Sequence, residues 1–294
     1  LGALLMLGNM VVALALAHRA ELFDIGPMGG WAIELQGLFL FGSLAILLLG
    51  VAIVLLPLWI AFVASTHPAN GIMQPPTPWW PGDHMLENYH AALFGGIKEV
   101  GGINVAVMLV NSTIMALAIA CGKIFISLLS AYAIVYFRFP FRMTCFWIIF
   151  ITLMLPVEVR ILPTFQVIAD LGMLDSYAGL SIPLIASATA TFLFRQFFLT
   201  VPDEYTEAAR IDGAGPVRFF FDILLPLSRT NIAALFVILF IYGWNQYLWP
   251  LLVTTDESYY TIIMGIQRMV AVPDSEPLWH IIMATATLAM LPPV

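Results

Sequence analysis

Seven long apolar stretches dominate this chain of 294 residues and restrict it to a membrane fold. A bilayer core about 30 Å thick needs roughly 20 apolar helical residues to cross it. Only 10% of the residues are charged, whereas about 25% is usual for soluble domains. We therefore predict an all-α, polytopic transmembrane helix bundle. The candidate spans are Leu1–Ala17, Leu38–Val63, Ile103–Tyr136, Thr144–Val159, Tyr177–Phe194, Ile232–Leu252 and His280–Val294.

Basic residues gather in loops on one side of this bundle, and short loops rich in Lys and Arg stay in the cytoplasm. One side carries Arg138, Arg142, Arg195, Arg210, Arg218 and Arg229, and the opposite side carries Lys98, Arg160 and Arg268. We therefore predict that the segment around Arg210 is cytoplasmic and that residues 64–102 form an outer loop. The Pro-rich part of that loop, which contains two Trp residues, is predicted to rest on the outer surface.

A polar segment follows the fifth apolar stretch, and its charges exclude it from hydrocarbon. Thr200 is predicted to cap a helix that has acidic residues in its first turn. Gly213 is predicted to close this helix in the left-handed conformation. Pro216 is predicted to start a second helix, which ends at Pro226.

The first of these two helices carries adjacent small residues. Ala208 and Ala209 are predicted to lie on one face, where a partner protein could approach the backbone closely. An amphipathic helix at the membrane surface without a partner is the alternative interpretation.

The polar segment also carries a recognisable motif: Glu207, Ala208, Ala209, Gly213, Ile223, Leu225 and Pro226. These residues match the signature loop of ABC importer permeases at every fixed position, so the chain resembles that family. In the family this loop forms a coupling helix that inserts into a cleft on the ATP-binding subunit. The resemblance implies that the seven residues couple this chain to an ATPase.

Other segments extend the resemblance. Asn111-Ser112, Leu155-Pro156, Trp244-Asn245 and Leu248-Trp249-Pro250 resemble the sugar-type permeases related to the smaller permease of the maltose importer. The segments Phe150–Arg160, Ala186–Phe198 and Gly243–Tyr247 resemble the second permease of sn-glycerol-3-phosphate importers. The resemblance implies a MetI-like core of about six spans and uptake of sn-glycerol-3-phosphate.

Such permeases begin near the position of Leu38. We therefore expect residues 38–294 to form the permease transmembrane domain, and residues 1–37 to form an N-terminal extension that could contribute an extra span. The last apolar stretch ends in Leu-Pro-Pro-Val without a polar flank, so we expect that span to be incomplete here.

The resemblance also implies an assembly in the bacterial inner membrane. The expected partners are a homologous second permease, two ATP-binding subunits, a periplasmic solute-binding protein and the lipid bilayer. ATP and Mg²⁺ would be bound by the ATP-binding subunits, so we expect no cofactor in this chain.

Polar residues inside a span are costly, so each is a candidate for function. Arg160 could attract a phosphate while Glu158 holds the Arg160 side chain in place, with an interfacial ion pair as the alternative. Asn245 and Gln246, flanked by aromatic residues, could bind a polyol, and interhelical hydrogen bonding is the alternative. Lys123 is predicted to reach the cytoplasmic interface, without a role in transport.

Other classes of function find little support in the sequence. Gly122-Lys123 is followed by Ile124 and not by Ser or Thr, so no phosphate-cradling loop is present and we expect no ATPase or other enzymatic activity. The histidines of residues 64–102 match no metal-ligand spacing. A net charge of -7 without a basic run gives no reason to expect nucleic acid binding.

Two alternatives to a glycerol-3-phosphate permease stay open. A permease of the same family could carry a neutral sugar or another polyol phosphate. A secondary carrier is the weaker alternative, because it would need carboxylates at mid-membrane depth and usually an inverted repeat.

Overall fold

The computed structural model describes residues 2–16, 34–69, 71, 75–152, 157–271 and 276–293. Within these ranges the chain is helical and contains no strand, which confirms the all-α prediction. The elements in chain order are α1 (Gly2–Leu16), α2 (Glu34–Ser65), α4 (Met85–Phe94), η2 (Lys98–Val100), α5 (Val105–Tyr136), α6 (Arg142–Ile151), α7 (Val157–Asp170), α8 (Tyr177–Ser181), η3 (Ile182–Leu184), α9 (Ala188–Phe198), α10 (Asp203–Ile211), α11 (Pro216–Phe219), η4 (Phe220–Leu224), α12 (Leu225–Leu227), α13 (Arg229–Trp244), α14 (Leu248–Val253), η5 (Glu257–Tyr259), α15 (Ile262–Val270) and α16 (Trp279–Met290).

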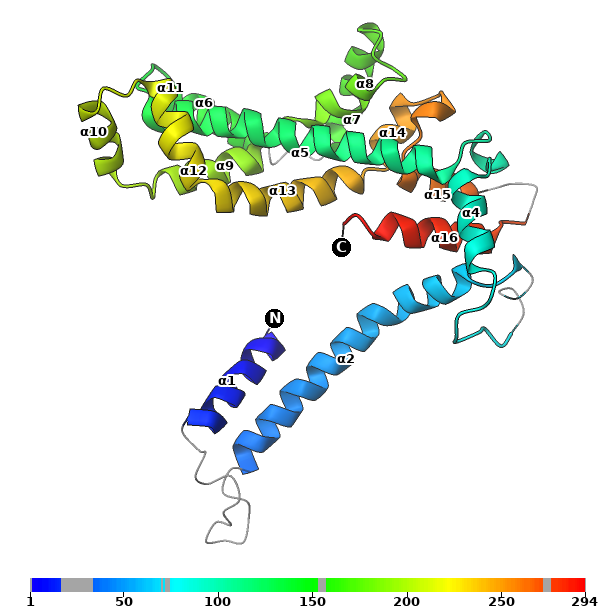
Figure 1. Cartoon of the computed structure of the whole chain (residues 1–294). Coiled ribbons are helices and arrows are strands. Elements are labelled where there is room, and N and C mark those ends of the chain that lie inside the picture. Colours follow the sequence, from blue (N-terminus) through cyan, green and yellow to red (C-terminus); the bar gives the residue numbers. More distant parts are fainter. Residues whose placement is uncertain are drawn as a thin grey trace, which may run out of the picture.

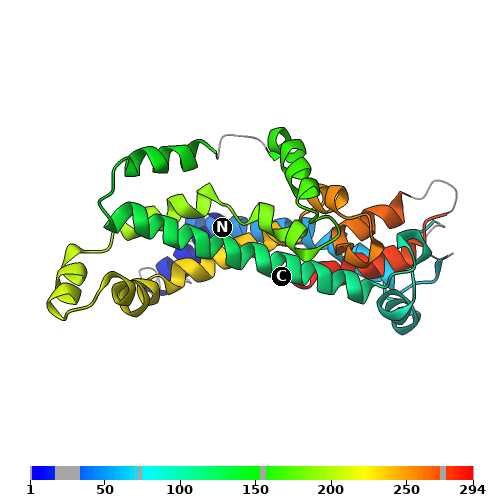
Figure 2. The same ribbon diagram turned by 90° about the horizontal axis from the view of Figure 1, so that it is seen from above.

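The long helix α5 organises the bundle. Asn104 caps its start, because the side-chain oxygen accepts a hydrogen bond from the Val107 amide at 3.1 Å. No proline interrupts the 32 residues of the helix, so it runs unbroken to Tyr136. α9 and α13 pack along it, α4 and α15 lie near its first residues, and α10 lies beyond its last residues (Figure 1; Figure 2). α5 therefore connects the two ends of the body.

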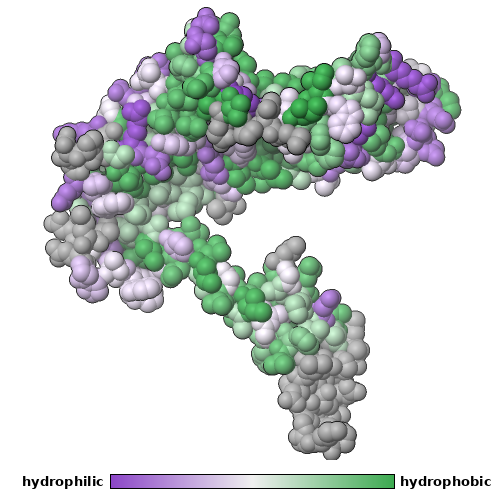
Figure 3. Space-filling model, turned by 180° about the vertical axis from the view of Figure 1, so that it is seen from behind, coloured by the Kyte–Doolittle hydropathy of each residue, from purple (hydrophilic) through white to green (hydrophobic). Residues whose placement is uncertain are grey.

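Helix α2 projects from this body, with α1 packed beside it (Figure 1). The most apolar 18-residue window of its segment Gly37–Ser65 has a mean hydropathy of 2.9, and 6% of that window is buried. Hydrophobic residues cover this arm and much of the middle of the body, whereas hydrophilic residues gather toward both ends of the body (Figure 3). Such an apolar exterior fits a lipid environment. α2 crosses the predicted boundary between residues 37 and 38, and that division of the chain stays a prediction.

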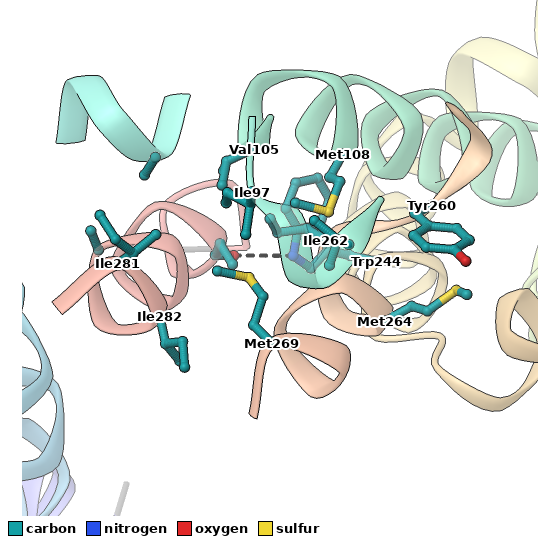
Figure 4. Packing of buried hydrophobic residues seen from close by; sticks show 14 of the residues in the cluster. Ile97, Val105, Met108, Trp244, Tyr260, Ile262, Met264, Met269, Ile281 and Ile282 are labelled. Carbon is teal, nitrogen blue, oxygen red and sulfur yellow. Dashed lines mark hydrogen bonds between the residues drawn. The ribbon is translucent and has the colours of Figure 1, made fainter. Parts of the chain in front are cut away.

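Buried side chains form three clusters along α5. Met108 belongs to the first, Ile119 to the middle one and Tyr132 to the last. In the first cluster, side chains of α5, α13, α15 and α16 meet (Figure 4). There the Trp244 indole donates a hydrogen bond to the Ala289 carbonyl at 3.1 Å. This bond ties α16 to the body.

The seven predicted spans all fall on apolar helices, but only some of these are continuous. α2 and α5 are each long and apolar enough to cross a bilayer. Two helix pairs reach that length together and bend at a break, by 49° between η3 and α9 and by 72° between α12 and α13. The remaining three predicted spans fall on the shorter apolar helices Gly2–Ala13, Arg142–Ile151 and Trp279–Met290.

The predicted continuity of three spans is wrong. The span Thr144–Val159 ends as a helix at Ile151, and α7 begins at Val157, beyond four residues that lie outside the described ranges. The span Tyr177–Phe194 breaks at Ser187, whose side chain accepts from the Ala190 amide and thereby starts α9 as a separate helix.

The span Ile232–Leu252 breaks between Trp244 and Leu248. Pro250 lies in the first turn of α14, where the missing amide hydrogen leaves no helical bond unmade. The break leaves Asn245 and Gln246 between two helices instead of inside one.

The predicted clustering of basic residues at two ends of the molecule agrees with the structure for four of these residues. Arg138 and Arg210 line one cavity at the last turn of α5. At the other end, η2 with Lys98 contacts α15, which carries Arg268. The outer loop also contains α4, which the sequence pattern did not predict, as it did not predict α15.

Candidate coupling loop and polar pocket

Helix α10 is the polar element between α9 and α11. Asp203 and Glu204 lie in its first turn and Arg210 in its last, so both ends carry charges that stabilise the helix dipole. The predicted cap is wrong. Pro202 occupies the N-cap position, and the Thr200 hydroxyl donates instead to the Phe197 carbonyl of α9 at 2.7 Å.

The end of α10 agrees with the prediction. Gly213 has a φ of 72°, in the left-handed region. Its amide donates to the Arg210 carbonyl at 3.1 Å, and the Ala214 amide donates to the Ala209 carbonyl at 2.8 Å. This pair of bonds is a Schellman motif, which satisfies carbonyls that the helix leaves without partners. The chain therefore turns sharply from α10 toward Pro216.

The segment after the turn is anchored to α5. The Tyr132 hydroxyl donates to the Pro216 carbonyl at 2.9 Å. The rings of Phe219 and Phe220 pack against Tyr132, with ring centroids 6.5 Å and 5.0 Å away. The helix predicted to end at Pro226 instead passes through a π-helical segment to Leu227, because Pro226 lies in the first turn of α12, where proline is tolerated.

Exposure divides the seven predicted coupling residues into two groups. Glu207, Ala208 and Gly213 are exposed. Ala209 is buried, and the remaining residues are half-buried: Ile223, Leu225 and Pro226. The prediction that Ala208 and Ala209 share one accessible face is wrong, because adjacent helical residues point about 100° apart and Ala209 turns toward Phe219 and Phe220.

The sequence pattern did not single out two exposed apolar residues of this loop. Ile211 is 86% exposed and Val217 is 71% exposed, on either side of the Gly213 turn. In the sequence they are single apolar residues among polar neighbours, which carries no periodic signal. In the structure they add apolar surface beside Glu207.

The bond between Tyr132 and Pro216 yields a small, specific prediction. Replacing Tyr132 by Phe keeps the ring packing and removes the hydrogen bond, so we expect a loss of stability of about 1 kcal/mol. Melting of the purified protein measures this loss. Tyr205→Phe is the matched control, because Tyr205 is 46% exposed on α10. If both variants melt at the same temperature, the hydrogen bond between Tyr132 and Pro216 does not help to anchor the segment after the turn.

A polar pocket of about 120 Å³ lies beside the middle of α5. It is lined by residues of α5, α7, η3, α13 and α14 and of the segments between them: Lys123, Arg160, Ile161, Thr164, Pro183, Leu184, Ala186, Tyr242, Gln246, Leu248 and Trp249. We call this the Lys123 pocket. It brings together residues more than a hundred positions apart in the sequence.

The structure corrects the sequence-based placement of two cations. Lys123 does not reach the cytoplasmic interface: it is 6% exposed, and its ammonium lies 3.6 Å from the centroid of the Tyr242 ring. Arg160 does not lie in an outer loop, because it lines the same pocket from α7. Lys123 was missed because helix periodicity carries little signal in a helix that is apolar on all sides.

The other residues predicted to line the transport path lie in different places. Gln246 lines the pocket, and its side-chain amide donates to the Tyr242 carbonyl at 3.1 Å. Asn245 is exposed at the C-cap of α13 and is outside the pocket lining. The Glu158 side chain lies outside the described residues, so its pairing with Arg160 stays a prediction.

These features define a polytopic membrane protein with a packed, water-facing loop at one end and a polar pocket at mid-length. Residues 123–293, more than half of the chain, match the family described as binding-protein-dependent transport system inner membrane component. The chain belongs to this family. It is therefore a multi-pass transport component of the membrane.

Similar proteins share most of their length with this chain. It is 64% identical over 248 residues to the sn-glycerol-3-phosphate transport system permease protein UgpE of Agrobacterium fabrum, covering 84% of this chain and 88% of that protein. It is 63% identical over 249 residues to UgpE of Brucella melitensis, covering 85% and 88%. UgpE of Salmonella choleraesuis is 57% identical over 262 residues, covering 88% and 92%.

A solved structure supports the fold. A chain from a bacterial ABC transporter involved in the import of the acidic polysaccharide alginate superposes with a TM-score of 0.73, at 20% sequence identity. The superposition covers 87% of this chain and 93% of that chain. The ABC permease fold expected from the resemblance is thereby confirmed.

Proposed function

We propose that this chain is the permease subunit of an ABC importer for sn-glycerol-3-phosphate in the bacterial inner membrane. The observation that carries the proposal is an identity of 57–64% to UgpE permease proteins over most of the chain. The alternative substrates are a neutral sugar or another polyol phosphate. The two cations of the Lys123 pocket favour a phosphorylated substrate over a neutral one.

In this proposal the chain works inside a larger assembly. A homologous second permease completes the path, and a periplasmic solute-binding protein delivers the substrate. Two ATP-binding subunits bind ATP and Mg²⁺ and supply the energy. One of them docks on the coupling loop, which comprises α10, the turn at Gly213 and the segment from α11 to α12.

The exposed part of the loop suits such docking. Glu207 and Ala208 supply an accessible polar and a small residue, while Ile211 and Val217 supply apolar surface. The other coupling residues pack the loop against the bundle. They are the buried Ala209 and the half-buried Ile223, Leu225 and Pro226. The predicted coupling residues thus divide into contact residues and packing residues.

Packing explains how the loop transmits motion. α10 and α11 share one buried cluster with α5, α9 and α13, so a push on the loop moves these helices as a unit. The 72° bend between α12 and α13 turns displacement along the loop into rotation of α13. α13 carries Tyr242 of the Lys123 pocket, so rotation at the loop changes the pocket. Repeated cycles would open the path to each side in turn.

Uptake of labelled sn-glycerol-3-phosphate into proteoliposomes tests the proposal. The vesicles contain this chain with its second permease, its ATPase and its binding protein. We expect uptake that requires ATP and that unlabelled sn-glycerol-3-phosphate suppresses more strongly than glycerol. Uptake without nucleotide would favour a secondary carrier, and uptake of a neutral sugar alone would reject the phosphorylated substrate.

A further inference from the structure

The Lys123 pocket contains an unusual excess of positive charge. Lys123 and Arg160 both line it, and its described lining includes no carboxylate. Two like charges that share a small cavity repel each other, and they do so more strongly away from water. Lys123 is the buried member of the pair, and a buried charge is stable only when something else compensates it.

The position of Lys123 makes its charge more costly. It lies 18 positions after Val105 and 13 before Tyr136, which at about 1.5 Å per residue is roughly 27 Å and roughly 20 Å from the two ends of α5. Lys123 thus lies near the middle of α5, which is long and apolar enough to cross a bilayer. A lysine near a helix end can extend its ammonium to the lipid headgroups. Lys123 is too deep for that and is 6% exposed.

The surroundings satisfy this lysine only in part. Its ammonium faces the Tyr242 ring, which attracts a cation but accepts no conventional hydrogen bond. Within the described part of the chain, neither the Lys123 ammonium nor the Arg160 guanidinium donates a hydrogen bond or forms an ion pair. A buried ammonium with three donors therefore faces a cavity that has room for a ligand.

The pocket chemistry specifies that ligand. A phosphate monoester carries a charge of about -1.5 to -2 and three strong acceptor oxygens. A guanidinium binds two of those oxygens side by side, and an ammonium supplies a compact charge for a third. Gln246 donates to the Tyr242 carbonyl, which leaves its own carbonyl oxygen as an acceptor for a substrate hydroxyl. The rings of Tyr242 and Trp249 supply apolar walls for a short carbon skeleton.

We infer that Lys123 and Arg160 together bind the phosphate group of the transported substrate halfway through the membrane, with Tyr242 positioning Lys123. This inference rests on the proposed function and adds a site to it. It explains why two cations converge at mid-depth with no carboxylate among the described residues that line the pocket, because the passing substrate supplies the negative charge. A free phosphate ester is the intended ligand, since lipid headgroups lie at the membrane surfaces.

The first test measures uptake of labelled sn-glycerol-3-phosphate by the complete reconstituted complex. Because a charge-assisted contact is lost, we expect Lys123→Met and Arg160→Gln each to reduce uptake about tenfold or more. Lys123→Arg keeps the charge and should retain more uptake than Lys123→Met. Arg160 is exposed, so its variant reports on binding even if Lys123→Met assembles poorly.

The matched control is Arg268→Met. Arg268 also lies over an aromatic ring, that of Tyr260, with its guanidinium carbon 4.5 Å from the ring centroid. Arg268 lies on α15 and does not line the Lys123 pocket. We expect this variant to keep its affinity for the substrate. If uptake falls equally in all variants, Lys123 has only a structural role and the inference is overturned.

A second measurement separates the site from the proposed function. The purified complex, in detergent without phospholipid, is mixed with sn-glycerol-3-phosphate or inorganic phosphate, and broadening of the phosphorus NMR signal reports binding. We expect broadening with the native protein and much less with Lys123→Met or Arg160→Gln. Phospholipid added back should not compete if the ligand is a soluble ester; competition would assign the site to a lipid headgroup.

The outcomes are distinguishable. Native uptake with unchanged uptake by both pocket variants overturns the site and keeps the proposed function. Absent native uptake with phosphate binding that depends on Lys123 rejects sn-glycerol-3-phosphate as substrate and keeps an anion site. Phosphate binding that is equal in native and variant proteins overturns the site whatever the substrate is.

Discussion

Gly213→Val is expected to reduce substrate uptake about tenfold, because a left-handed backbone costs an ordinary residue about 1–2 kcal/mol and a β-branched one more. Gly213 has a φ of 72°, and the Schellman bonds at the end of α10 depend on that conformation. Opening the turn shifts Glu207 and Ile211 relative to the bundle while the apolar helices stay inserted. ATP hydrolysis should then continue without matching uptake.

Gly215→Val is the matched control for this experiment. Gly215 lies in the same loop, with a φ of -70° and a ψ of 170°, and a Cβ added there meets nothing within 4 Å. The conformation is one that any residue adopts before a proline. A Cβ at Gly213 also meets open space, so the two variants differ in backbone strain and not in crowding. If Gly213→Val and Gly215→Val show the same uptake and the same ATP hydrolysis, the left-handed turn at Gly213 has no role in the proposed coupling.

The coupling loop was predictable because its signals are local. A proline, acidic residues at a helix start and a glycine at the helix end act within a few positions of one another. The start of α10 near Asp203 and the left-handed Gly213 therefore follow from neighbouring residues. The sequence did not show which alanine would be accessible, because Ala209 is buried by Phe219 and Phe220, which belong to α11 and η4.

The Lys123 pocket was only half predictable. Arg160 and Gln246 are polar residues in apolar surroundings, which singles them out in any membrane chain. Their convergence with Lys123 depends on the break between α13 and α14 and on the packing of α13 against α5. Tyr242 lies 119 positions after Lys123, so no local pattern relates the two residues.

Helix breaks were the main source of error in the span predictions. Ser187 and residues 245–247 interrupt the apolar stretches only briefly, so hydropathy averaged over a long window joins the flanking helices. The breaks depend on a capping hydroxyl and on a proline whose position in a first turn becomes clear only in three dimensions. Both breaks flank the Lys123 pocket, where non-helical backbone inside a membrane protein is tolerated because it lines a polar cavity.

Asn111 illustrates a residue that the sequence flagged without giving its role. Its side-chain amide donates to the carbonyls of Ser258 and Tyr260, at 2.7 Å and 3.0 Å. Its side-chain oxygen accepts from the Tyr177 hydroxyl at 2.7 Å. One buried amide thus joins α5, α8 and the segment before α15. The neighbouring Ser112 hydroxyl accepts from the Ile262 amide at the first residue of α15.

Asn111→Leu is therefore expected to destabilise the end of the bundle around the first turns of α5. Two carbonyls and one hydroxyl lose their partner, but only the Tyr260 carbonyl belongs to a buried residue, whereas Ser258 and Tyr177 are exposed. An unsatisfied buried group costs about 1–3 kcal/mol, so we expect a loss of that size, seen as a melting temperature lowered by several degrees. Thermal melting of the purified protein in detergent measures it.

Thr113→Val serves as the control for this variant. Thr113 lies two residues further along α5, and its hydroxyl bonds only to the Leu109 carbonyl of the same helix, at 2.7 Å. Valine preserves the shape of the side chain, and the Leu109 carbonyl keeps its helical partner, so melting should barely change. A small effect of Asn111→Leu, similar to that of Thr113→Val, would mean that water replaces the lost amide. In that case this end of the bundle would be held by apolar packing around Met108 and Ile262 rather than by the Asn111 bonds.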